Sequence, residues 1–336
     1  MKKYLFYLPL LLSFYFVSCS DSDDTNDNLA KNGFATGVCT DADYFTATIS
    51  GFVDLKIIPG VKAYGVVYGT TNTLTSETGT LAPAKELDEN NGFSVALDDL
   101  NPATTYYFAT FVQLAGEYKY GAVKSFATKG LTKGDYVDLG LKSGTLWASK
   151  NVGAKSPTDG GLYFQWGDTK GYTSNTSDGK SFDWPSYKHC NGSYTSITRY
   201  NTSPSLGIVD DKTELVLSED DAAYANCGKD WRMPSKEQFD ELVSNAYTLR
   251  KTVTVNNISG KIFISRKNGN SIFFPLAGYR NGPGLYSSGV NGSYWSRTLR
   301  SNNPLSALRL NCSTDAVIVN DFDRNNGLCV RPVRNK

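Results

Sequence analysis

The sequence has 336 residues, with 34 basic and 33 acidic side chains, and its net charge is +1 at pH 7. A chain so close to neutrality lacks the basic field that attracts nucleic acid, and no nucleic-acid partner is predicted. The length suffices for two domains, and 21 tyrosines and 31 glycines beside only 2 methionines favour turn-rich β structure.

The N-terminus has the pattern of an export signal. Two lysines precede an apolar run over residues 4–17, which is too short to cross a hydrocarbon core as a helix, since that takes about 20 residues. The residues before Cys19 resemble the lipobox at which bacterial lipoproteins are cleaved and acylated, with Phe16 where leucine is usual. We therefore predict a signal peptide over residues 1–18, a lipid on Cys19 and anchoring to a membrane through that lipid.

Residues 19–30 are polar and acidic, and this composition favours an unfolded tether. The Ser-Asp-Ser-Asp-Asp stretch after Cys19 resembles the export tag of Bacteroidota lipoproteins that are sent to the cell surface. A solvated tether without a targeting role explains the same stretch. The predicted location is the outer membrane, lipid-anchored and facing the cell exterior.

Residues 31–128 are predicted to form an all-β domain. Alternating patterns between turn residues indicate strands at residues 46–52, 63–69, 92–97, 106–112 and 119–128. Residues 100–106, Leu-Asn-Pro-Ala-Thr-Thr-Tyr, are similar to a segment of fibronectin type III domains, in which the tyrosine bonds back to the backbone. Residues 123–128 resemble the last strand of that family. The resemblance implies a β-sandwich that serves as a spacer or an interaction module.

A linker over residues 129–134 leads to a second domain over residues 135–334. It is predicted to open with a hairpin whose turn lies at residues 142–144. Two helices are predicted next, the first beginning with a capping box at Ser218 and the second with a capping box at Ser235. Later strands are predicted at residues 261–265, 271–275, 293–296, 306–310, 316–319 and 329–333.

The second domain contains a series of short sequence motifs. They are Asp-Leu-Gly-Leu at 138–141, Trp-Ala at 147–148, Asn-Val-Gly-Ala at 151–154, Tyr-Phe-Gln-Trp-Gly-Asp at 163–168, Glu-Asp-Asp-Ala-Ala at 219–223, Trp-Arg-Met-Pro-Ser at 231–235, Pro-Leu-Ala-Gly-Tyr-Arg at 275–280, Tyr-Trp-Ser at 294–296 and Val-Arg-Pro-Val at 330–333. This series resembles the Fibrobacter succinogenes major paralogous domain. The resemblance implies an α+β, C-type-lectin-like fold with long irregular loops and no established reaction. The chain is thus predicted to be multidomain, with an all-β sandwich before a lectin-like domain.

Five cysteines remain after the lipidation site. An exported protein can form disulfides, and two pairs are candidates, Cys312 with Cys329 and Cys190 with Cys227. Buried free thiols are the equal alternative. No pair has the Cys-x-x-Cys spacing of a zinc or redox site.

Acidic residues offer one weak metal site. Asp321, Asp323 and Asn325 lie in a polar stretch predicted to be a turn, and their oxygens could bind Ca²⁺. The Glu-Pro-Asn, Gln-Pro-Asp and Trp-Asn-Asp motifs of calcium-dependent lectins do not occur, so no cofactor is expected, with Ca²⁺ as the exception to test. The single histidine, His189, is expected on a loop surface rather than in a catalytic dyad.

Aromatic side chains are the better indication of a binding site. Trp147, Trp231 and Trp295 lie within the family motifs and are predicted to pack the core. A second group lies in loop-like sequence and is expected to be exposed for ligand binding: Trp184, Tyr187 and Tyr286, with Arg280 near the last of them.

These features favour a non-catalytic surface protein that binds a glycan or a surface protein. The alternative is a structural or tip subunit of a fimbria-like assembly with no small ligand. A third hypothesis is an enzyme, because formylglycine-generating enzymes share the lectin-like fold. Their catalytic cysteine pair has no evident counterpart in this sequence.

Overall fold

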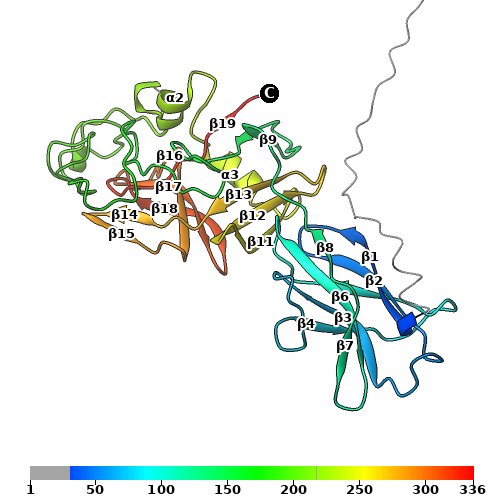
Figure 1. Ribbon diagram of the computed structural model, residues 1–336. Coiled ribbons are helices and arrows are strands. Elements are labelled where there is room, and N and C mark those ends of the chain that lie inside the picture. The colour runs from blue at the N-terminus through cyan, green and yellow to red at the C-terminus, as the bar shows by residue number, and fades with distance from the viewer. Residues whose placement is uncertain (1–30, 217) are drawn as a thin grey trace, which may run out of the picture. The chain divides into compact units, whose positions relative to one another are not determined.

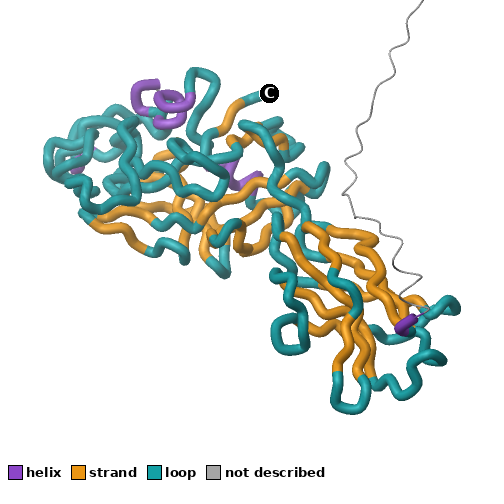
Figure 2. Tube along the Cα trace, in the orientation of Figure 1, coloured by secondary structure: helices purple, strands orange, loops and turns teal. Residues whose placement is uncertain are grey.

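The computed structural model describes residues 31–216 and 218–336. The predicted signal peptide, Cys19 and the acidic tether lie outside these residues. The chain divides into two compact units, of which the first runs through Lys129, apart from Asn101–Ala103, and the second includes Gly130–Lys336. Strands in several separate sheets dominate both units and helices are few (Figures 1 and 2). None of the described helices is long and apolar enough to cross a membrane.

The first unit consists of two antiparallel sheets (Figure 1). The strands of one sheet are, in spatial order, β1 (Phe34–Ala42), β2 (Ala47–Val53) and β5 (Gly92–Leu97). The strands of the other are β4 (Thr80–Pro83), β3 (Ala63–Gly69), β6 (Thr105–Gln113) and β7 (Tyr118–Tyr120), with β8 (Lys124–Ala127) also paired to β6.

Both sheets contribute to one hydrophobic core. Along β2 every second residue is buried, as expected of a strand with one face turned to a core, and Ile49 and Val53 are fully buried. They belong to the same cluster as Val66 and Phe108 of the second sheet. Thr110 also joins the sheets, because its hydroxyl donates a hydrogen bond to the Ala35 carbonyl at 2.9 Å.

The second unit contains several small sheets. One joins β9 (Tyr136–Asp138), β10 (Leu146–Ala148) and β19 (Val333–Arg334), so the first and last strands of the unit lie together. A three-stranded meander is formed by β11 (Thr248–Val255), β12 (Ile258–Ser265) and β13 (Ser271–Pro275). A second meander is formed by β16 (Asn291–Leu299), β17 (Ser306–Ser313) and β18 (Val317–Asp323). A hairpin is formed by β14 (Tyr279–Asn281) and β15 (Gly284–Tyr286).

The second predicted helix is confirmed. α3 (Lys236–Leu242) begins after Ser235, whose side chain accepts from the Gln238 backbone N–H, while the Gln238 side chain accepts from the Ser235 backbone N–H. Phe239 and Leu242 are buried as their spacing predicts.

The first predicted helix begins later than expected. Ser218–Asp220 forms the single 3₁₀ turn η2, and α2 (Ala222–Cys227) is capped by Asp221 rather than by Ser218. The Asp221 carboxylate accepts from the backbone N–H groups of Ala223 and Tyr224, and also from that of Met233. The contact to Met233, twelve residues along the chain, favours Asp221 over Ser218 as the cap. A local sequence pattern cannot predict this contact.

Two further hydrophobic clusters fill the second unit. Trp147 and Trp295 are fully buried in them, as predicted, and Trp231 is partly buried at the edge of one. Arg331 is also fully buried. Its guanidinium donates to the Asn151 side chain and to the Phe273 carbonyl, both at 2.8 Å, and thereby ties the C-terminal segment to β13 and the start of the unit.

Candidate functional site

The structure buries two of the four predicted ligand-binding residues. Tyr187 is 2% exposed, and its hydroxyl donates to the Trp166 carbonyl and accepts from Arg324, both at 2.7 Å. Arg280 is fully buried, and its guanidinium binds both carboxylate oxygens of Asp178, at 2.6 and 3.1 Å. Both side chains are buried and bonded to internal partners, although Arg280 Nε has none. The prediction that these two residues are exposed for a ligand is therefore wrong.

The other two predicted residues are accessible but do not form one site. Trp184 is half-buried and makes edge contacts with Tyr187 and with the exposed Tyr194. Tyr286 is 48% exposed on β15 and stacks on Tyr279. No ring contact among the described residues joins Trp184 to Tyr286. Trp184 lies in a loop, whereas Tyr286 lies on strand β15.

His189 is buried, contrary to the expectation of a loop surface. Its Nε2 lies 3.2 Å from the Gly167 carbonyl and 3.5 Å from the buried carboxylate of Asp220. Burial lowers the pKa of His189 to about 4, although Asp220 acts in the opposite direction. Gly167, at φ 80°, packs so closely on the imidazole that a Cβ would lie 2.7 Å from Nε2.

Asp220 holds this region together. It accepts hydrogen bonds from Lys188 at 2.7 Å and from Tyr200 at 2.8 Å, and Arg199 lies 3.0 Å away. Burial opposes ionisation, but these bonds and the neighbouring cations prevail and lower the pKa of its carboxyl group. With its charge neutralised by internal partners, the Asp220 cluster serves to fasten long loops to the core.

Cys190, Cys227, Cys312 and Cys329 form no disulfide in the structure, and both predicted disulfides are wrong. Cys312 on β17 pairs with Gly292 of β16, whereas Cys329 pairs with Tyr294 on the opposite edge of β16. Two strand spacings separate them, about 10 Å, which exceeds the Cα separation a disulfide can bridge. Cys190 is half-buried in its loop, where its thiol donates to the Trp184 carbonyl, and Cys227 is exposed.

The weak calcium candidates are engaged by protein groups. Asp321 and Asp323 lie on strand β18 rather than in the predicted turn. Asp321 pairs with Arg300, and Asp323 accepts from the Ser306 hydroxyl at 3.1 Å. The Asn325 side chain is buried; its amide nitrogen donates to the Phe182 carbonyl at 3.4 Å, while its Oδ1 has no hydrogen-bond partner. No cluster of three or more His, Cys, Asp or Glu side chains suited to a metal occurs in the described part of the chain.

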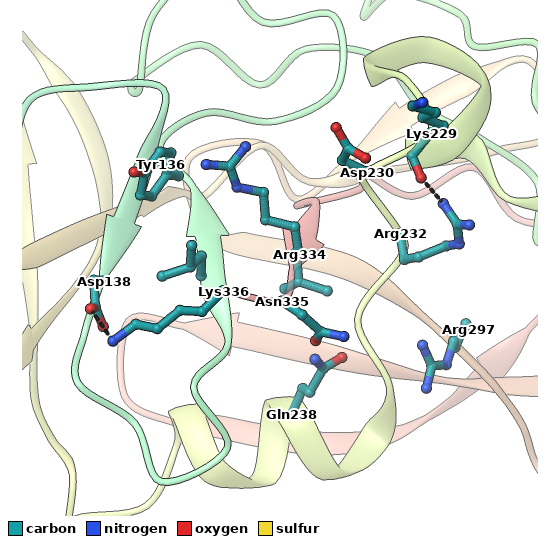
Figure 3. A pocket seen from close by; sticks show the side chains of 12 residues that line it. Tyr136, Asp138, Lys229, Asp230, Arg232, Gln238, Arg297, Arg334, Asn335 and Lys336 are labelled. Atoms are coloured by element: carbon teal, nitrogen blue, oxygen red, sulfur yellow. Dashed lines mark hydrogen bonds and ion pairs between the residues drawn. The ribbon is translucent and has the colours of Figure 1, made fainter.

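A groove of about 860 Å³ lies where the first and last strands of the second unit meet (Figure 3). We call it the basic groove and define it by the twelve residues that line it: Tyr136, Asp138, Leu146, Lys229, Asp230, Arg232, Gln238, Arg297, Val333, Arg334, Asn335 and Lys336. Five of these side chains are cationic and two are acidic. The excess of positive charge would favour an anionic ligand over a cationic one.

The strand pairing positions Arg334 in this groove. Val333 pairs with Trp147 of β10 on one edge of β19 and with Arg232 on the other, and its side chain is buried. Because side chains alternate along a strand, the next residue, Arg334, points to the opposite face. Arg232 is brought beside it by the short turn after α2, in which the Trp231 backbone N–H donates to the Gly228 carbonyl.

The guanidinium of Arg334 is held by aromatic rings rather than by acids. Its Cζ lies 4.1 Å from the ring centroid of Tyr136 and 5.2 Å from that of Trp231. The Nε atom is buried and has no hydrogen-bond partner. Across the described residues, no carboxylate forms an ion pair with Arg334. The side chain is therefore fixed in place while its hydrogen-bond donors stay unused.

The neighbouring cations differ in how far their charge is neutralised. Lys336 pairs with Asp138 at 2.7 Å, and this hydrogen bond lowers the pKa of the Asp138 carboxyl group. Arg297 lies 3.3 Å from Glu214. Arg232 donates to the carbonyls of Lys229 and Trp231, and its Cζ lies 4.5 Å from the Tyr224 ring centroid (Figure 3). Lys229 is exposed. Among the described residues no carboxylate pairs with Arg334, Arg232 or Lys229, so these three cations are the most available to a ligand.

Sequence reasoning did not identify the basic groove. Its residues come from β9, the turn after α2, α3, β16 and the C-terminal segment, so they lie up to two hundred positions apart. The one local signal for the groove was that Arg232 and Arg334 lie within or next to the family motifs. Arginines at such positions are easily interpreted as core residues.

Comparisons with known proteins give no identity. No family model matches the sequence, and no curated protein does. Among solved structures, one similar chain is a β-sandwich protein from a study of computer-based redesign, with 19% sequence identity and a TM-score of 0.22. The match covers 30% of this chain and 93% of that chain, and a likeness of this size carries no inference about fold or function.

Proposed function

We propose that this chain is a cell-surface lipoprotein that binds an anionic ligand in the basic groove, without catalysing a reaction. The observation that carries the proposal is Arg334, whose guanidinium lies over the rings of Tyr136 and Trp231 and has no acidic partner among the described residues. A protein that only needed this residue for packing would gain more from an apolar side chain, since desolvating an unpaired cation costs free energy. A fixed and unpaired guanidinium is prepared to receive a carboxylate, sulfate or phosphate.

The fold proposed for the first unit is a fibronectin type III-like sandwich. Leu100 and Tyr106 of the Leu-x-Pro-x-Thr-x-Tyr segment are buried, and the Tyr106 ring stacks on Phe126 of β8 at 5.6 Å. A core shared by two antiparallel sheets supports this assignment. The unit would act as the spacer between the lipid and the second unit.

For the second unit we propose the C-type-lectin-like fold of the Fibrobacter succinogenes major paralogous domain. Two helices among small sheets, a long loop region and the pairing of β10 with β19 support it. The basic groove and the loop region provide two surfaces for recognition. We infer no calcium requirement for the basic groove, because its cations would bind the ligand directly.

Replacing Arg334 tests the binding function. The chain from residue 21 onward is titrated against carboxymethyl-dextran and dextran sulfate at low salt, with uncharged dextran as the reference polymer. We expect Arg334→Ala to weaken binding to at least one polyanion about 10- to 100-fold, since a charge-assisted hydrogen bond contributes about 1.5–3 kcal/mol. Adding EDTA should change nothing.

The control is Lys155→Ala, which removes one positive charge from an exposed position outside the basic groove. If binding reflects only the net charge of the protein, both variants will weaken it equally. That result, or the lack of any polyanion binding, would contradict the proposal. A protein that binds no polyanion but copurifies with other surface proteins would point to the fimbria-like alternative.

Lipid anchoring is tested at Cys19. We expect cells that express the full chain with a Cys19→Ala substitution to incorporate no radiolabelled palmitate into it, because the thiol that carries the diacylglyceryl group is lost. The unsubstituted chain should be labelled and sediment with the outer membrane. Cys39→Ala, which removes a thiol of the first unit, is the matched control and should leave labelling intact. Equal labelling of the Cys19→Ala chain would refute the assignment.

A further inference from the structure

We infer that the ligand of the basic groove is a carboxylated polysaccharide, such as a polymer of uronic acid. This inference rests on the proposed function and specifies the chemistry of its ligand. Arginine predominates among the cations of the groove, with Arg232, Arg297 and Arg334 against Lys229 and the paired Lys336. The planar fork of a guanidinium matches the two oxygens of a carboxylate, whereas lysine acts as a point charge.

The aromatic supports of Arg334 favour a sugar over a peptide or a simple ion. Tyr136 is 42% exposed, although one side of its ring already contacts Arg334, so part of its flat surface remains open to the groove. Flat aromatic faces beside a hydrogen-bonding group suit the amphipathic ring of a sugar. Asn335 and Asp230 are exposed groove residues that can bond to sugar hydroxyls.

A phosphorylated ligand is less well matched. Phosphate sites commonly use the free backbone N–H groups at the start of a helix. The helix beside the basic groove is α3, and its N-terminus is closed by the capping box of Ser235 and Gln238. Gln238 lines the groove, but its amide also donates to the Thr145 hydroxyl at 3.0 Å. The helix therefore contributes no open anion site.

The distribution of charge favours a polymer. The cations come from separate segments of the chain, and Figure 3 shows Arg334 between the Lys336–Asp138 pair on one side and Arg232 on the other. A single small anion would need donors converging on one point. Donors spread along a groove suit a ligand with repeated carboxylates and sugar rings between them.

The test compares four polymers at equal concentration of monomer units: polygalacturonate, its methyl ester, poly-glutamate and dextran sulfate. We expect polygalacturonate to bind at least tenfold more tightly than its ester, which keeps the sugar backbone but lacks the charge. It should also bind at least fivefold more tightly than poly-glutamate, which keeps the carboxylates but lacks the sugar rings.

Arg334→Lys separates the fork geometry from the charge alone. We expect it to weaken polygalacturonate binding about tenfold, close to the effect of Arg334→Ala, and Lys155→Ala to leave it unchanged. Tryptophan fluorescence during urea unfolding verifies that each variant is folded. Equal or tighter binding of dextran sulfate or poly-glutamate, or full binding by Arg334→Lys, would overturn the polysaccharide inference while the anion-binding function stands. If the natural chain shows no binding that depends on Arg334 to any of the four polymers, both the polysaccharide inference and the anion-binding function are overturned.

Discussion

Replacing Arg331 with methionine is expected to destabilise the second unit by several kcal/mol, since each buried acceptor left without a donor costs about 1–3 kcal/mol. Arg331 is fully buried, and burial lowers its pKa to about 10, so it stays charged at neutral pH. Its guanidinium donates to Asn151, to the Phe273 carbonyl and to the carbonyls of Ala148 and Ser149. Methionine has a similar length but leaves these acceptors without donors.

Urea unfolding followed by tryptophan fluorescence measures this effect. All five tryptophans of the chain lie in the second unit, so their emission reports the unfolding of that unit alone. Arg331→Lys should recover part of the stability, because one ammonium can reach some of the acceptors but cannot span them all. Lys155→Met, at an exposed position, should stay within about 0.5 kcal/mol of the natural chain. A change below 1 kcal/mol in Arg331→Met would contradict the role assigned to it.

Acidification below pH 6.5 is expected to weaken the second unit through His189. Its pKa is about 4 in the folded protein, against 6.5 for an exposed histidine, because burial disfavours the charged imidazole. Between these values the unfolded chain binds more protons than the folded one, so the free energy of unfolding falls as the pH falls. The full loss between pH 6.5 and 4 is about 3 kcal/mol.

His189→Gln isolates this contribution from that of the carboxylates. Glutamine can keep a hydrogen bond to the Gly167 carbonyl but does not titrate. We expect the free energy of unfolding of the variant to depend less on pH between 6.5 and 4 than that of the natural chain. The Asp220 carboxyl, whose pKa is lowered from its ordinary value of 3.8, loses most of its stabilising contribution below about pH 4, so it contributes only at the acid end of this window. Parallel pH profiles for the two proteins would contradict the prediction.

The proposed ligand binding in the basic groove and the stability of the core depend on arginines whose surroundings differ. Arg331 and Arg280 donate to several acceptors inside the protein, whereas among the described residues no carboxylate pairs with Arg334, which lies three residues after Arg331. All three guanidiniums also lie over aromatic rings. The same residue type therefore ties the fold together at two positions and remains available to a ligand at the third. Arg331 precedes strand β19, whereas Arg334 lies on that strand, directly after the buried Val333.

Local chemistry explains the predictions that were confirmed. Ser235 and Gln238 lie three residues apart, so their reciprocal caps form within one turn and can be read from the sequence. The alternation of residues 46–52 likewise predicts the half-buried strand β2. Where the helix signal depended on a distant partner, as for Asp221 and Met233, the predicted start was three residues early.

The sequence by itself determined that the chain is rich in strands and where α3 begins, because these features follow from short-range periodicity and capping. The burial of Trp147 and Trp295 was predicted from their place in the motifs of the resembled family. Tertiary structure alone decided the exposure of loop side chains. Tyr187, His189 and Arg280 lie in polar, loop-like sequence, yet distant backbone carbonyls and carboxylates satisfy them in the interior. The basic groove was decided in the same way, since strand pairing between the two ends of the second unit brings its cations together.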